Sequence, residues 1–130
     1  MFKSRSYLSE IPFLVITATI IFYFVVGFSI LKPDNIAWLM NGDAATQYLG
    51  WAFFRNSDWA IPLGLNPKYG LEIATALIYS DSIPLLGFTF KILNSLISET
   101  FQYFGLWILL CFILQAIFSW KLLGLSLIHI

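Results

Sequence analysis

Residues 11–31 read IPFLVITATIIFYFVVGFSIL, a stretch without a single charged side chain. Folded as an α-helix, at about 1.5 Å per residue, this stretch would be ~30 Å long, the thickness of the hydrocarbon core of a bilayer. A second apolar run covers residues 101–123, and 59% of the chain is hydrophobic while 11% is charged. A soluble domain needs more charge than this to cover its surface. The sequence therefore predicts an integral membrane protein.

The formal net charge of the chain is zero, from seven basic and seven acidic residues. Nucleic-acid binding requires a basic stripe that displaces counterions from phosphates, so we expect no nucleic-acid partner. The one cysteine, Cys111, lies inside the second apolar run. It has no second cysteine with which to form an internal disulfide, and we interpret it as a small buried hydrophobic residue.

The charges near the N-terminus predict the orientation of the first span. Lys3 and Arg5 precede it, and positive charge beside a span resists translocation. A cleaved secretory signal peptide would also begin with basic residues, but the apolar run here exceeds the ~7–15 residues typical of such peptides. We therefore predict an uncleaved anchor with a cytoplasmic N-terminus, which places the following loop outside the membrane.

The predicted fold class is all-α, an integral membrane bundle of about three transmembrane helices that occupies residues 1–125. The spans lie near 11–31, 83–97 and 101–123, and an outer loop covers 32–82. The middle span is the shortest, because residues 83–97 give only ~22 Å of helix. It also contains Lys91, which would have to reach the cytoplasmic surface or face a protein-lined cavity.

The outer loop begins with a predicted amphipathic helix that lies along the membrane surface. On a helical wheel its polar face carries Asp43, Thr46, Gln47 and Gly50, opposite Ala45, Tyr48, Leu49 and Ala52. The run Asn56-Ser57-Asp58 would end this helix. Such helices lie in the headgroup region, and the tryptophans and tyrosines of the loop favour the same place. We expect the polar face to be directed to water or to a site.

Asp43 is the leading candidate for chemistry, because it begins the predicted surface helix close to the membrane plane. A carboxylate there could act as a general base or bind a divalent cation that bridges to a lipid phosphate. An aspartate at the start of a helix is also a preferred cap, and the two interpretations are compatible. Asp81 is a second candidate, although it or Ser82 would equally cap the helix that begins near Pro84.

Three further side chains of the loop are candidate substrate contacts. Gln47 lies on the polar face with Asp43, and Arg55 and Lys68 could bind a phosphate or an anionic headgroup. The sequence contains no glycine-rich nucleotide loop, zinc-binding motif or serine-hydrolase motif, so those chemistries have no support.

Several strings of the chain, in order, resemble an uncharacterised family of bacterial multi-pass membrane proteins. The strings are Gly42-Asp43, Gln47 to Arg55, Pro62 to Pro67, Ser80 to Leu86, and Phe101 to Trp107. The layout of that family is similar to the glycosyltransferase C superfamily, in which a first span leads into a large outer loop with an acidic residue near its start. Asp43 matches the position of that acid.

The resemblance implies a membrane glycosyltransferase, located in the bacterial inner membrane, that takes sugar from a polyprenyl-phosphate carrier on the outer face. Asp43 would be its base or its metal-assisting carboxylate. Two alternatives stay open. In a transporter or flippase, Lys91 and the glutamines of the spans would line a polar path. In a small structural membrane protein, both aspartates would only cap helices.

Residues 126–130 are predicted to be a non-native tail. The string from Leu125 to Ile130, LSLIHI, resembles a translated sequencing adapter. On this interpretation the natural protein continues beyond this string, and His129, the only histidine, has no functional role.

Overall fold

Two regions of the chain pack as separate units in the computed structural model, which describes residues 9–70 and 75–126. The first unit takes in Met1–Lys32 and Tyr103–Ile130, and the second is Pro33–Gln102. Two predictions fall outside the described residues: the cytoplasmic N-terminus, which rests on Lys3 and Arg5, and the identity of the tail beyond residue 126.

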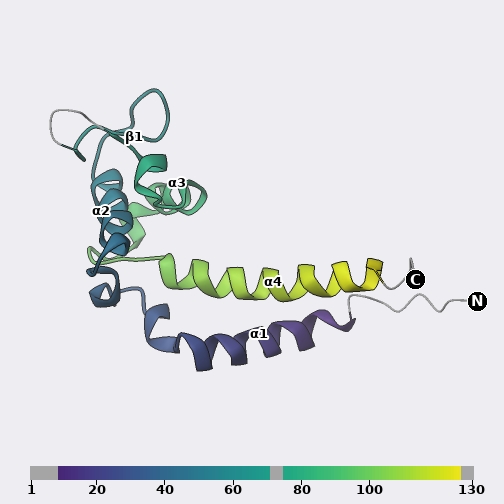
Figure 1. Ribbon diagram of the computed structural model, residues 1–130. Helices are drawn as coiled ribbons and strands as arrows, with labels where there is room; N and C mark the ends of the chain where they lie inside the picture. Colours follow the sequence, from purple (N-terminus) through teal and green to yellow (C-terminus); the bar gives the residue numbers. More distant parts are fainter. Residues whose placement is uncertain (1–8, 71–74, 127–130) are drawn as a thin grey trace, which may run out of the picture. The chain divides into compact units, whose positions relative to one another are not determined.

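The first unit is a pair of apolar helices that lie side by side and run antiparallel (Figure 1). They are α1 (Ile11–Val25) and α4 (Phe104–Ser126), and a short 3-10 helix, η2 (Phe28–Leu31), follows α1. The edge of the Phe22 ring meets the Phe112 ring at a centroid distance of 5.6 Å. Gly105 lies directly against the carbonyl of Ile30, where any Cβ would collide with the backbone.

The predicted span at 101–123 corresponds to α4, which is long and apolar enough to cross a membrane. The predicted span at 11–31 is not one continuous helix, because α1 ends at Val25 and Gly27, with φ of +86°, turns the chain before η2. Both helices expose large apolar side chains, such as Phe24 and Leu122. Cys111 is also exposed, so the prediction that it is buried is wrong.

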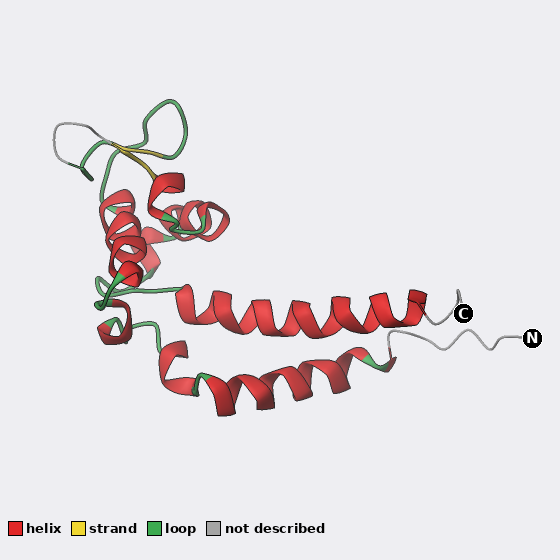
Figure 2. Ribbon diagram, viewed as in Figure 1, coloured by secondary structure: helices red, strands yellow, loops and turns green. Residues whose placement is uncertain are grey.

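The second unit is mostly helical but contains a small sheet that the all-α prediction omitted (Figure 2). Strand β1 (Leu65–Asn66) pairs antiparallel with β2 (Thr75–Ala76). The helices of this unit are η3 (Ala37–Leu39), α2 (Asp43–Arg55), η5 (Leu77–Ser80), α3 (Pro84–Ile92) and η6 (Asn94–Leu96).

The predicted middle span at 83–97 is corrected by the structure. Helix α3 has nine residues, which at about 1.5 Å per residue gives ~14 Å, half the thickness of a hydrocarbon core. The α-helix ends at Ile92 and η6 follows, because Lys91 and Asn94 are both bonded to the end of α2. This segment therefore forms no spanning helix, and a bundle of three transmembrane helices is not what the described residues show.

Helix α2 begins at Asp43 and ends before Asn56, so the predicted surface helix is confirmed as a helix. Its predicted faces are confirmed only in part: Asp43 and Thr46 are exposed and Tyr48 is buried, as expected. Gly50, placed on the polar face, is buried, whereas Leu49, placed on the apolar face, is exposed. The buried side carries Trp51, Phe54 and Arg55 beside Tyr48, and the Trp51 Nε1–H donates to the carbonyl of Phe101 at 3.1 Å. This side packs against η5 and α3 rather than against lipid.

Candidate functional site

The predicted site residues do not form one cluster, because three of them lie at opposite ends of α2. Asp43 is the first residue of the helix and Arg55 the last, which at about 1.5 Å per residue puts their backbones ~18 Å apart. Lys68 belongs to the far end, because its Nζ donates to the carbonyl of Asn56 at 3.3 Å. A single phosphate could not contact both ends.

At the first end, Asp43 is exposed in the first turn of α2. The capping residue is Gly42, with φ of +62°, and no side chain caps the helix, so Asp43 is not the cap that the sequence suggested. Its carboxylate still lies where the helix dipole favours negative charge, a contribution of about 0.3–1 kcal/mol. The Thr46 hydroxyl donates to the Asp43 backbone carbonyl at 2.6 Å, which leaves the Asp43 carboxylate out of this bond.

A metal site at Asp43 would need ligands beyond this residue. Across residues 9–70 and 75–126, no three histidine, cysteine, aspartate or glutamate side chains gather where they could hold a metal ion. A divalent cation takes about six or more oxygen ligands, of which Asp43 would supply one or two.

Asp81 is exposed and follows η5 in a left-handed conformation, with φ of +49°. The cap position of α3 is Ile83, without a side-chain cap, so the prediction that Asp81 or Ser82 caps this helix is wrong. Ser82 is fully buried, and its hydroxyl donates to the backbone carbonyl of Gln47 at 2.7 Å. The structure thus ties Gln47 to the core through its backbone, while its side chain is half-buried.

At the other end of α2, Arg55 is buried and its guanidinium is used within the chain. The Nε–H donates to Asn94 Oδ1 at 2.7 Å, and Nη1 donates to the carbonyls of Ser98 and Glu99 at 3.0 and 3.1 Å. Burial lowers the pKa of Arg55, an effect that the Tyr48 hydroxyl and Glu99 partly oppose. These bonds assign Arg55 to holding the chain after α3, rather than to a phosphate.

Lys91 is the cation whose role the sequence did not predict. Its Nζ donates to the carbonyls of Phe54 and Ser57 at 2.7 and 2.9 Å and to the Ser57 hydroxyl at 3.1 Å. The same ammonium lies over the Phe54 and Trp59 rings, 4.0 and 4.7 Å from their centroids. Burial lowers its pKa, while Asp58 raises it and Lys68 lowers it further. A lysine in an apolar segment too short to cross a bilayer was the available signal for an internal role.

Residues 15–128 match the domain of unknown function DUF6311. The chain belongs to the DUF6311 family. No curated protein and no solved structure matches the chain. The DUF6311 match confirms that the chain falls in a family without an assigned function, and it adds no information about glycosyltransferases.

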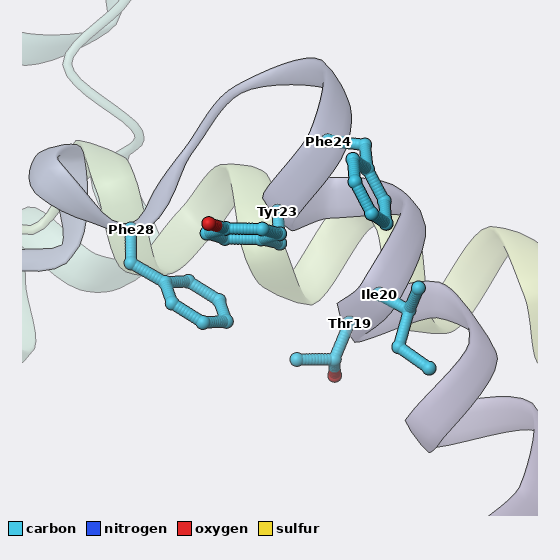
Figure 3. Close-up of a pocket in the computed structure, with 5 residues that line it drawn as sticks. All are labelled: Thr19, Ile20, Tyr23, Phe24 and Phe28. Carbon is cyan, nitrogen blue, oxygen red and sulfur yellow. The ribbon is translucent and has the colours of Figure 1, made fainter.

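Open grooves occur on the surface that the described residues of this DUF6311 chain form. One, of about 350 Å³, lies at the end of α2 between Ala52, Phe53, Asn56 and Lys68. Another, of about 240 Å³, lies along α1 and is lined by Thr19, Ile20, Tyr23, Phe24 and Phe28 (Figure 3). The Tyr23 and Phe28 rings approach each other there, with centroids 5.1 Å apart. The Thr19 hydroxyl donates to the Val15 carbonyl at 2.8 Å, so this second groove presents mainly hydrocarbon.

Proposed function

We propose that the chain is the N-terminal membrane region of a multi-pass bacterial inner-membrane glycosyltransferase that uses a polyprenyl-phosphate-linked sugar. In this proposal α1 and α4 lie in the bilayer, and the residues between them form the outer loop. Two features of the structure support a membrane location. Helix α4 has the length and composition of a span, and both helices present large apolar side chains outward. In water such surfaces would drive association.

The proposed chemistry rests on the position and exposure of Asp43. Asp43 is an exposed carboxylate at the start of the first α-helix after α1, on a helix whose other side is fixed in the core. In the proposed step an acceptor hydroxyl attacks the anomeric carbon of the sugar, and the bond from that carbon to the phosphate oxygen breaks. Asp43 takes the hydroxyl proton, and polyprenyl phosphate leaves. If Asp43 instead held a cation beside the departing phosphate, that phosphate would take the proton.

The other predicted contacts have unequal support. Gln47 follows Asp43 by one turn of α2 and stays a candidate, as does the exposed Asp81. Arg55 and Lys68 lie at the opposite end of α2, and Arg55 is already bonded within the chain. In our proposal neither of these two cations binds the phosphate of the reacting donor.

The test is Asp43→Asn in the intact protein in its native membranes, with sugar transfer from a labelled polyprenyl-phosphate donor as the readout. General-base catalysis contributes about 10²–10⁴-fold, so we expect a loss of that size. Asp58→Asn is the matched control, because Asp58 is also exposed but follows the far end of α2. Transfer by the Asp43→Asn variant at the wild-type rate would contradict the proposal.

One observation favours a second candidate, a structural membrane protein without catalysis. The buried cations Arg55 and Lys91 are both used to bond backbone carbonyls of the same unit. If stabilisation is the only role of the charged groups, Asp43→Asn lowers helix stability by less than about 1 kcal/mol and changes no specific activity. The enclosed position of Lys91 counts against the transporter alternative, in which this side chain would line a polar path.

A further inference from the structure

The pattern of burial in helix α3 is the reverse of the pattern in a surface helix of a water-soluble protein. It buries Lys91, of which 6% is exposed, and exposes Leu85 and Ile92, each 72% exposed. Leu96, in the following η6, is 80% exposed. A surface helix in water directs its leucines inward and its lysine outward. We call the exposed surface formed by Leu85, Thr89, Ile92 and Leu96 the α3 face.

Hydrogen bonds to residues in and just after α2 hold the α3 face in one orientation. Lys91 anchors α3 through its bonds to Phe54 and Ser57, and this sets which residues of the helix point outward. Arg55 then holds the carbonyls of Ser98 and Glu99, just after η6. With both ends tied to α2, the leucines cannot turn inward without breaking these bonds. The neighbouring η5, which contacts α3, adds two more exposed side chains, Ile78 and Tyr79.

We propose that the α3 face is immersed in the boundary between the headgroups and the acyl chains of the bilayer that α4 crosses. The inference rests on the membrane location in the proposed function. The α3 face carries no charged side chain, which suits an apolar medium. Leu96 precedes the first residue of α4 by eight residues, and a fully extended chain of that length reaches about 30 Å or less. The length of this linker therefore allows Leu96 to reach the surface at which α4 would enter the bilayer.

The test measures which medium touches the α3 face. A nitroxide is attached to a single cysteine at Leu85→Cys, Ile92→Cys or Leu96→Cys, in a Cys111→Ala background. The intact protein is placed in vesicles of phosphatidylethanolamine and phosphatidylglycerol without sugar donor. Collisions of the nitroxide with oxygen, which concentrates in lipid, are compared with collisions with a water-soluble nickel chelate. Asn56→Cys, exposed at the end of α2, is the matched control.

The native Cys111 separates the two proposals, because it is exposed on α4 and reports whether that helix lies in lipid. We expect an oxygen-to-nickel collision ratio several-fold higher on the α3 face than at Asn56→Cys, together with a lipid signature at Cys111. A water signature at the α3 face with lipid at Cys111 overturns this inference and leaves the membrane region standing. Protection from both reagents means that protein covers the α3 face, which also overturns it. A water signature at Cys111 overturns the membrane proposal itself.

Discussion

The Nζ of Lys91 lies 2.7 Å from the carbonyl oxygen of Phe54 and 4.0 Å from the centroid of the Phe54 ring. One ammonium thus meets the last turn of α2 twice, through the backbone and through a side chain. The last carbonyls of a helix have no partner within it and carry partial negative charge. Lys91 supplies a charged partner from α3, beside the Ser57 hydroxyl that also donates to the Phe54 carbonyl, and the contact joins the two main helices of the second unit.

Lys91→Met should destabilise the second unit by about 2–3 kcal/mol. The substitution keeps the length and bulk of the side chain but leaves the carbonyls of Phe54 and Ser57 buried without their charged donor, and bonds to charged groups contribute about 1.5–3 kcal/mol. Denaturant unfolding in detergent gives the free energy. Lys68→Met is the control, because within residues 9–70 and 75–126 its exposed ammonium makes a single 3.3 Å bond, and its effect should stay below about 0.5 kcal/mol. Equal effects of the two substitutions would show that the Lys91 contacts contribute nothing special.

The pH dependence of stability should carry the signature of Lys91. Burial lowers its pKa in the folded protein, so between that pKa and the ordinary value of about 10.4 the unfolded chain binds more protons. Stability therefore rises with pH in that window, by at most about 1.4 kcal/mol per pH unit. The raised pKa of Tyr48, which burial causes, acts with the opposite sign only near and above about pH 10. The rise should be measured below that pH, and Lys91→Met should abolish it.

The sequence predicted the α-helices better than the surfaces they bury. The length and composition of residues 101–123 predicted α4, and the turn residues after Arg55 marked the end of α2. The wheel of α2 was wrong at Gly50 and Leu49 because angular position does not show which side of a helix meets distant partners. Arg55 was a candidate phosphate contact, yet its Nε and Nη1 donate inside the unit, and Gly50 is buried because two serines occupy the space beside it. Such partners lie some 30 to 50 residues away along the chain, where no local pattern shows them.

The predicted middle span, residues 83–97, also shows that a local pattern does not reveal distant partners. Its apolar composition predicted a span, but composition does not reveal whether an apolar helix faces lipid on all sides or on one. The bonds of Lys91 show that one side of this segment packs on protein, since its three acceptors come from the end of α2 and the turn that follows α2.

The prediction of the site had a different limit. Asp43 and Arg55 both belong to α2, but a helix keeps its two ends apart, and the sequence alone treated them as one loop.

Arg55→Lys should cost about 2 kcal/mol although the charge is kept. A lysine ammonium cannot reproduce the planar fork that bonds Asn94 through Nε and the carbonyls of Ser98 and Glu99 through Nη1. A double-mutant cycle of Arg55→Met with Asn94→Ala measures the interaction energy between these two side chains, and we expect a coupling of at least about 0.5 kcal/mol. Additive effects would mean that the 2.7 Å contact between these two side chains contributes no stability of its own.

Gly50→Ala should be destabilising at a position where helix propensity alone predicts the reverse. Within a helix, alanine is favoured over glycine by about 1 kcal/mol. Here the new Cβ would lie 2.7 Å from the Ser82 hydroxyl and closer still to the hydroxyl and Cβ of Ser80. Both serines are buried and bonded to each other, so they have no room to withdraw, and overpacking of this kind costs about 1–3 kcal/mol.

A second substitution identifies the source of this effect. Ser80→Ala in the Gly50→Ala background removes a hydroxyl but keeps the Cβ that collides, so it should restore little stability. Ser80→Gly removes both atoms and should restore more, despite the flexibility that glycine adds. Thermal unfolding of the two double variants against Gly50→Ala compares them directly. If Gly50→Ala alone proves more stable than the wild type, helix propensity outweighs the contact, and Ser80 and Ser82 do not press on α2 as the structure places them.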